Sequence, residues 1–276
     1  MATENAASRP ARRVVVAVNA AARCSETLET AALLAAAEGV ELEVVFVEDA
    51  DLLRLADLPV AREIDRISGA IRRIDNRGML RALEIEARRL RQEIARIERT
   101  RAVRSTLRIA RGQILTEALN ASERVEVTFV HAASRALPGD SSAPGPGYSF
   151  AGAKGSTARG ASRKRVWSIF EGGPEGARAL GAAEKIANAL ECRLMVLIRS
   201  HGTDDAEKLA REVRARVGDV ELRFFEPAEG RAALEAHMFE SRLSRLLVVA
   251  RQSPSLADAA TRRYLESLRV PLVIVA

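Results

Sequence analysis

Short apolar runs and longer amphipathic segments alternate along most of the chain. The runs, such as Val14–Val18 and Leu246–Ala250, are mostly apolar, and most are followed by a segment in which apolar residues recur every three or four positions. Such runs are typical of parallel strands covered on both faces, and the spaced segments are typical of helices. The pattern therefore predicts an α/β protein built on parallel sheet.

The element boundaries follow from the same pattern. Strands are predicted at residues 14–18, 42–47, 103–109, 125–130, 166–170, 194–198, 220–225, 246–250 and 271–275. Helices are predicted at residues 25–38, 112–122, 174–190, 204–217, 229–240 and 255–268. This order of strands and helices runs through the chain twice, which predicts two tandem, doubly wound parallel-sheet domains.

The domain boundaries are set by a change in composition. Residues 132–164 are rich in Gly, Pro, Ser and Ala and contain few large apolar residues, so they are expected to form a flexible linker. The first domain is then predicted at 11–131 and the second at 165–276. The first domain shows no obvious fifth strand before the linker, and it carries an additional helical segment at 61–100.

The additional segment has an amphipathic stripe. Apolar residues, all but Ala87 isoleucine or leucine, recur at spacings of three and four from Ile64 to Ile74 and again from Leu80 to Ile97, with a change of phase at Asn76-Arg77-Gly78. This pattern predicts two helices, or one kinked helix.

Positive charge is concentrated in the same part of the chain. The whole chain has 43 basic and 37 acidic residues, for a formal charge of +6. Residues 62–111 alone hold more arginines than acids, which is compatible with a polyanion-binding face. Arg and Glu are interleaved at helical spacings, however, and no aromatic residue is present. A solvated or partner-facing helix is therefore favoured, and nucleic-acid binding remains an alternative.

Three stretches resemble the universal stress protein family in a tandem two-domain form. They are "VVVAVNAAARCSETLETAALLAAAEGVELEVVFVED", its repeat "VWSIFEGGPEGARALGAAEKIANALECRLMVLI", and the terminal "LLVVARQ…RYLESLRVPLVIVA". The resemblance implies Rossmann-like domains with five parallel strands in the order 3-2-1-4-5. It also implies a crevice that binds ATP in some members, and a dimer formed through the final strand.

The phosphate-binding motif of those members is degenerate here. The motif is G-x-x-G-x9-G-[ST] after the fourth strand, and Arg251, Pro254 and Asp258 stand near its three glycine positions. Pro254 has no N–H to donate, and a carboxylate at Asp258 would repel phosphate. Asp258 suits the N-terminus of a helix instead. The sequence therefore predicts no bound ATP, and ATP or another adenine nucleotide is kept as the alternative cofactor.

A reduced crevice could still hold a small ligand. Its candidate residues are Asn19 after the first strand, Glu171, Gly172 and Gly173 after the equivalent strand of the second domain, and Arg251. Glu171 keeps an acid where nucleotide-binding members place Asp close to the adenosine. The competing interpretation is that Gly172-Gly173-Pro174 is only the turn into a helix, with Pro near its first position.

Catalytic and metal-binding patterns are missing. No P-loop, nucleophile elbow or GxGxxG after a strand occurs, and the three histidines have no metal-ligand spacing. Cys24 and Cys192 lack a CxxC partner and are expected to be reduced thiols. The protein is accordingly expected not to be an enzyme and to hold no metal.

The favoured hypothesis is a cytoplasmic stress-response or regulatory protein that acts through protein contacts. The β-branched final strand is expected to be a sheet edge through which a homodimer forms, with a further, unknown protein partner. The alternatives are a nucleotide or small-ligand sensor and a polyanion-binding protein. No apolar run is long enough to cross a bilayer, so membrane insertion is not expected.

Overall fold

The computed structural model describes residues 13–20, 24–64, 69–73, 76–131, 164–229, 234, 244–267 and 270–276. The elements, in chain order, are β1 (Arg13–Asn19), α1 (Ser25–Glu38), β2 (Glu41–Asp49), α2 (Ala50–Ala56), β3 (Arg62–Ile64), β4 (Ile71–Arg73), α3 (Asn76–Arg101), β5 (Ser105–Gly112), α4 (Ile114–Ser122), β6 (Val127–His131), β7 (Arg165–Phe170), α5 (Gly173–Ala189), β8 (Arg193–Arg199), α6 (Thr203–Val217), β9 (Glu221–Phe225), β10 (Ser244–Ala250), α8 (Pro254–Ala257), α9 (Ala259–Ser267) and β11 (Leu272–Val275).

Nine strands form one sheet in the order β5-β2-β1-β6-β11-β10-β7-β8-β9. All neighbouring strands are parallel except β6 and β11. Strands β7 to β11 follow the order 3-2-1-4-5 that the resemblance implies, and the N-terminal strands follow 3-2-1-4. The α/β fold expected from the sequence is confirmed. Residues 132–163 of the predicted linker, and most of the predicted helix at 229–240, lie outside the described residues.

The two halves of the sheet meet at an antiparallel seam between β6 and β11. Phe129 lies opposite Val273 and Thr128 opposite Ile274, and the N–H of Ala276 donates to the carbonyl of Glu126 at 3.0 Å. The C-terminal strand therefore takes the place beside β6 that a fifth strand of the N-terminal half would occupy. The expectation that this strand is a free edge for a homodimer is wrong, because β11 is paired on both sides.

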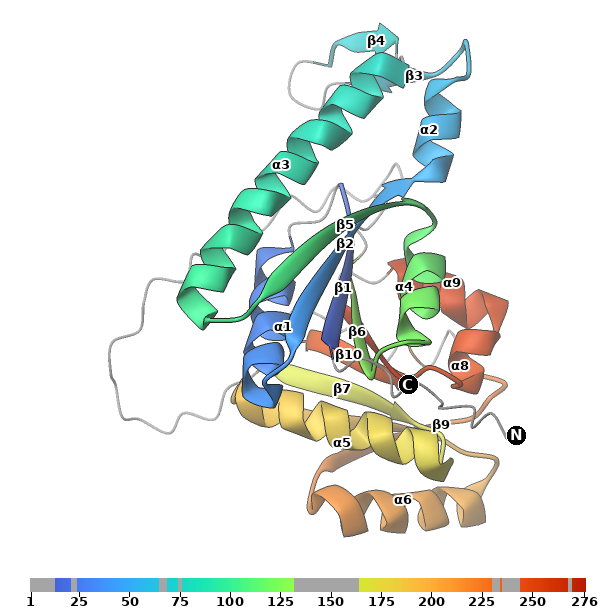
Figure 1. Cartoon of the computed structure of the whole chain (residues 1–276). Helices are drawn as coiled ribbons and strands as arrows, with labels where there is room; N and C mark the ends of the chain where they lie inside the picture. Colours follow the sequence, from blue (N-terminus) through green and yellow to red (C-terminus); the bar gives the residue numbers. More distant parts are fainter. Residues whose placement is uncertain are drawn as a thin grey trace, which may run out of the picture.

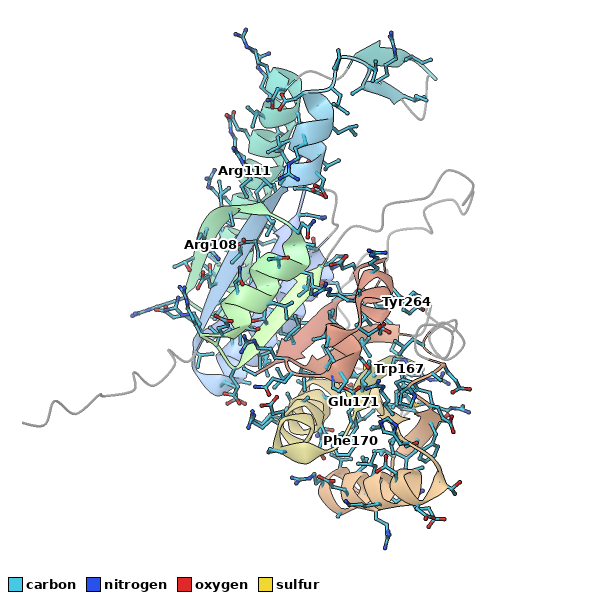
Figure 2. The ribbon with its side chains drawn as sticks, turned by 90° about the vertical axis from the view of Figure 1, so that its right-hand side faces the viewer. Arg108, Arg111, Trp167, Phe170, Glu171 and Tyr264 are labelled. Carbon is cyan, nitrogen blue, oxygen red and sulfur yellow. The ribbon has the colours of Figure 1, made fainter. Side chains whose placement is uncertain are left out.

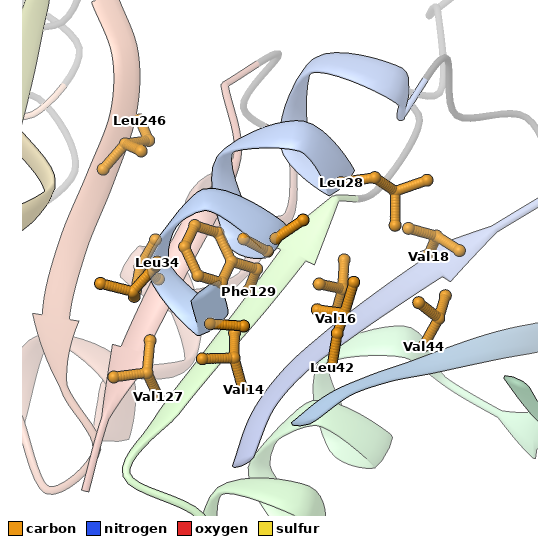
Figure 3. Packing of buried hydrophobic residues seen from close by; sticks show 14 of the residues in the cluster. Val14, Val16, Val18, Leu28, Leu34, Leu42, Val44, Val127, Phe129 and Leu246 are labelled. Carbon is orange, nitrogen blue, oxygen red and sulfur yellow. The ribbon is translucent and has the colours of Figure 1, made fainter. Parts of the chain in front are cut away.

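Helices cover both faces of the sheet. Helices α1, α5 and α6 lie on one face, and α4, α8 and α9 lie on the other (Figure 1). Phe129 of β6 is completely buried beneath α1, beside Val14 and Leu34 (Figure 3). Burial on both faces explains why central strands such as β1 are almost continuously apolar.

An arm, defined here as residues 50–101, projects beyond the N-terminal half of the sheet (Figure 1). The prediction of a helix from Ile64 to Ile74 is wrong, because β3 and β4 form an antiparallel hairpin with Ile64 opposite Ile71. Gly69, before β4, has a φ of +68°, which glycine adopts readily, and β-branched isoleucine suits a strand. Helix α3 begins at Asn76, where the sequence pattern changes phase, and continues as a single helix.

Candidate functional site

Parallel α/β sheets usually bind ligands beyond the carboxyl ends of the strands, where the strand order reverses. One such place lies beside the ends of β7 and β10, and a second crevice lies beside β1 and β2, against α3. They are called the C-terminal crevice and the N-terminal crevice below. Each is lined by residues that the sequence singled out, and the two are built differently.

The C-terminal crevice has a volume of about 300 Å³ and brings together three of the five candidate residues. Glu171, Gly172 and Gly173 line it with Gln252 and Ser253 from the loop after β10. Glu171 directly follows β7, next to Phe170 (Figure 2). Glu171, the acid after the first strand of the C-terminal half, therefore lies next to the loop after the fourth strand of that half, as expected.

The carboxylate of Glu171 is fully engaged by the protein itself. Arg199 Nη1 donates to Oε1 at 3.1 Å, and the hydroxyls of Ser255 (2.9 Å) and Ser253 donate to Oε1 and Oε2 respectively. The side chains of Glu171 and Arg199 are only 10% and 20% exposed. Because a carboxylate in such a place needs charge-assisted hydrogen bonds, these contacts hold the acid in a fixed position.

Gly172 and Gly173 shape the turn from β7 into α5. Both have positive φ, +80° and +74°, which disfavours any residue with a side chain. A Cβ on Gly172 would also lie 3.0 Å from Leu209. Pro174 occupies the first turn of α5, as its fixed φ allows. The interpretation of this stretch as a turn into a helix is confirmed, and the turn also forms one wall of the crevice.

Arg251 lies in the loop after β10 but does not line the C-terminal crevice. Its guanidinium donates to Glu123 beyond α4 at 2.6 Å, and its main-chain N–H donates to Val275 at 2.7 Å. The side chain thus connects the two halves of the molecule. Sequence reasoning placed it near Glu171, and the structure separates them.

The loop after β10 is stabilised by caps rather than by glycines. Ser253 caps α8 by accepting the N–H of Ser255 at 3.1 Å, and Asp258 accepts the N–H of Thr261 at 2.7 Å. Hydrogen bonds from Thr261 hold the pKa of Asp258 below its ordinary value. The expectation that Asp258 serves a helix N-terminus is confirmed. Ser253, Ser255 and Arg199 were not singled out from the sequence, although the Ser-Pro-Ser spacing is typical of a helix cap.

The N-terminal crevice, of about 270 Å³, lies beside Asn19 and is covered by α3. Its lining includes Asn19 and Cys24 together with Glu86, Arg89 and Glu93 of the long helix. Burial raises the pKa of the Cys24 thiol to about 11, so this thiol is protonated at neutral pH. The crevice is therefore lined by acids, an arginine and an unreactive thiol.

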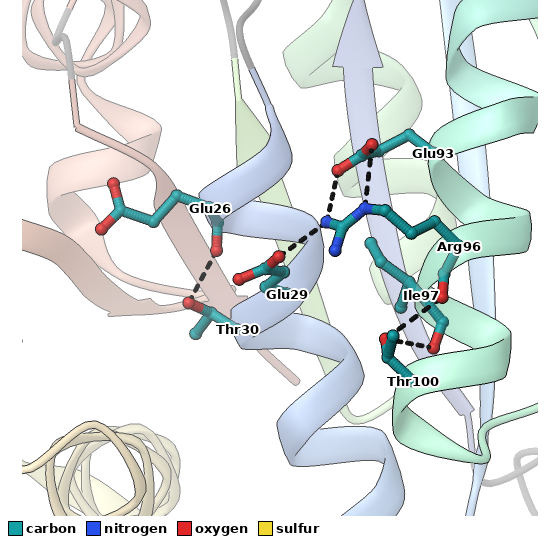
Figure 4. Close-up of polar contacts among 7 residues, drawn as sticks. All are labelled: Glu26, Glu29, Thr30, Glu93, Arg96, Ile97 and Thr100. Carbon is teal, nitrogen blue, oxygen red and sulfur yellow. Dashed lines mark hydrogen bonds and ion pairs between the residues drawn. The ribbon is translucent and has the colours of Figure 1, made fainter. Parts of the chain in front are cut away.

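Helix α3 is fixed over this crevice by apolar packing and by an ion-pair network. Leu83, Ala87, Leu90, Ile94 and Ile97 are buried in the same core as α1. Arg96 donates at 2.7 Å to both Glu93 of its own helix and Glu29 of α1 (Figure 4). The hydrogen bond from Arg96 lowers the pKa of Glu93. The pairs are solvent-exposed, so most of the stabilisation comes from the apolar stripe.

Other site classes find no support in the part of the chain that the structure describes. No group of three or more His, Cys, Asp or Glu residues there is arranged to hold a metal ion. Within the same residues, no helix combines the length and apolar character needed to cross a bilayer.

Comparison with known proteins identifies the fold. No protein-family model and no curated protein matches the chain. A solved universal stress protein from Archaeoglobus fulgidus DSM 4304 aligns with a TM-score of 0.50 and 13% identity over 95% of each chain. A functionally unknown protein from Pseudomonas aeruginosa PAO1 aligns at 0.46 and 13% identity, over 97% of this chain and 93% of its own. The chain thus has the fold of universal stress proteins.

Proposed function

We propose that the protein is a non-catalytic regulatory protein of the universal stress type that acts through protein contacts and binds no ATP. The observation that carries the proposal is the engagement of Glu171 by Ser253, Ser255 and Arg199. In nucleotide-binding members the corresponding acid is available to the adenosine. Here a nucleotide would have to displace three hydrogen bonds of a mostly buried carboxylate, which is costly.

The phosphate end of the crevice supports the same proposal. The loop after β10 has Pro254 in place of a glycine, and proline cannot donate a main-chain hydrogen bond to phosphate. Asp258 places a negative charge at the start of α9, where the helix dipole would otherwise attract a phosphate. A stress-response role in the cytoplasm is part of this proposal and rests on the likeness of fold.

The test is a titration of the whole protein with ATP, AMP and cyclic AMP, followed by thermal shift and calorimetry. A ligand present at one hundred times its Kd stabilises the folded state by about 2.7 kcal/mol, which is readily visible. We expect no change in the melting temperature at millimolar nucleotide. A saturable shift that Gly172→Ala abolishes would refute the proposal. Gly181→Ala, in the middle of α5 with open space around it, is the matched control.

A small-ligand sensor is the second candidate function. It is favoured by the volume of the C-terminal crevice, about 300 Å³, and by the Gln252 side chain on its lining. Pockets of this size accept small molecules. The same titration tests this candidate: binding of AMP or cyclic AMP without ATP would favour the sensor over the first proposal, and failure of all three nucleotides would remove the nucleotide version of it.

A further inference from the structure

The arm carries most of the exposed large apolar side chains of the described surface. Seven of the nine exposed large apolar residues in the described part of the chain lie on residues 50–101. Val60, Ile64 and Ile71 are 77%, 66% and 62% exposed. Scattered apolar residues are normal on a protein surface, but a concentration on one projecting element is typical of an interaction site.

The hairpin at the end of the arm is unusually small for a free-standing element. Each strand has three residues, and Ile64 and Ile71 face each other across the pair. Among the described elements, β3 and β4 make extensive contacts only with each other. An isolated two-stranded hairpin is marginally stable in water, so covering the isoleucine pair would stabilise it. Arg62, two positions before Ile64, lies on the same face of the strand.

The outer side of α3 is positively charged along its length. The helical positions opposite the buried stripe include Arg77, Arg81, Arg88 and Arg99 and contain no acid. Arg88 has a weak pair with Glu84 at 3.8 Å, at the margin of this side. The other three arginines make no ion pair among the residues that the structure describes. They extend over about 33 Å of helix, at 1.5 Å per residue.

We infer that the arm docks an acidic protein segment that carries an apolar face, such as an amphipathic helix lying along α3 with one end against the hairpin. The arginine side provides charge complementarity to the segment, and the isoleucine pair provides the apolar contact. This inference rests on the proposed function and names the chemistry of the partner. A second copy of the arm would bring arginines together, and nucleic acid would leave the isoleucines in water.

The probe is a synthetic peptide of about three heptads, with leucine at the core positions and glutamate and alanine elsewhere. Its binding to the whole protein is measured by fluorescence anisotropy at low salt. We expect saturable binding that weakens at least about tenfold in Arg77→Glu/Arg81→Glu/Arg88→Glu and, separately, in Ile64→Ser/Ile71→Ser. A peptide with lysine in place of glutamate, and polyglutamate without leucine, are expected to bind much more weakly.

Matched variants elsewhere on the surface give the control. Ile109→Ser and Phe224→Ser remove side chains of 45% and 44% exposure outside the arm, and Arg262→Glu/Arg263→Glu reverses charge on exposed positions of α9. These variants should bind the peptide as the parent protein does. Circular dichroism on every variant confirms that folding is retained.

Three results would overturn the inference. They are no saturable binding of the acidic peptide, equal loss in the control variants, and tighter binding of a DNA duplex or of anionic vesicles than of the peptide. Any of these results would refute the inference and would leave the outcome of the nucleotide titration unchanged. Conversely, nucleotide binding in the C-terminal crevice would refute the proposed function while leaving peptide binding measurable.

Discussion

The N-terminal and C-terminal crevices lie at different strand pairs in the two halves of the sheet, and their walls are built by different means. The wall of the C-terminal crevice is fixed locally, by hydrogen bonds between Glu171 and the loop after β10. The N-terminal crevice is covered by α3, a helix from the inserted arm, through a long apolar contact. The comparison shows that a crevice at the edge of a parallel sheet can be shaped by a few polar residues of neighbouring loops or by an added helix.

The largest expected effect on stability comes from the packing of α3 over the N-terminal crevice. Leu90→Ala removes a buried side chain of α3 that lines the crevice, and should lower the free energy of unfolding by about 3 kcal/mol. Urea unfolding followed by circular dichroism measures this change. Ile85→Ala, on the exposed side of the same helix, should change it by less than about 0.5 kcal/mol. Equal effects would show that α3 is not packed over the crevice.

The next effect concerns the C-terminal crevice. Glu171→Ala leaves Arg199 without its partner and removes the acceptor of two serine hydroxyls, which should cost about 2 kcal/mol in the same unfolding experiment. The control is Glu175→Ala, which breaks only a more exposed pair with Arg178 at 3.7 Å and should cost below about 1 kcal/mol. If Glu171→Ala were neutral, this carboxylate would not hold the wall of the crevice in place.

The smallest expected effect is a pH dependence of stability that arises from His131, at the carboxyl end of β6. His131 shares a 2.5 Å hydrogen bond with Thr27 of α1, and burial lowers its pKa below the ordinary 6.5. The unfolded chain therefore binds a proton more readily, and stability should fall as the pH drops from about 7.5 towards the pKa of the folded protein. The free energy of unfolding, measured at several pH values, should fall less steeply with decreasing pH in His131→Asn. His201→Asn, at an exposed position, should retain the full dependence.

The sequence was sufficient for the repeated αβ plan and insufficient for two parts of the molecule. Strands such as β1 and β10 were recognisable because burial on both faces makes them continuously apolar. The hairpin was missed because isoleucines spaced by three and four suit a helix as well as two short strands. The spacing alone contained no information on which hydrogen bonds form.

The candidate site was predicted only in part, for a related reason. Glu171, Gly172 and Gly173 were placed correctly at one crevice because they directly follow an identifiable strand. The partners of Glu171 come from Arg199 at the end of β8 and from two serines after β10, more than eighty positions later in the second case. Contacts between loops so distant in sequence depend on how the strand ends converge, which a single sequence does not specify.

The seam between β6 and β11 has a consequence for how the chain reaches its folded state. Strand β6 cannot complete its pairing until residues 272–275 have been synthesised, so one apolar edge of the N-terminal half waits for the far half of the chain. Pairing between such distant segments is slow, and an unpaired edge is prone to association with other chains. Refolding yield should therefore depend on protein concentration more steeply than in a protein whose halves complete their own sheets.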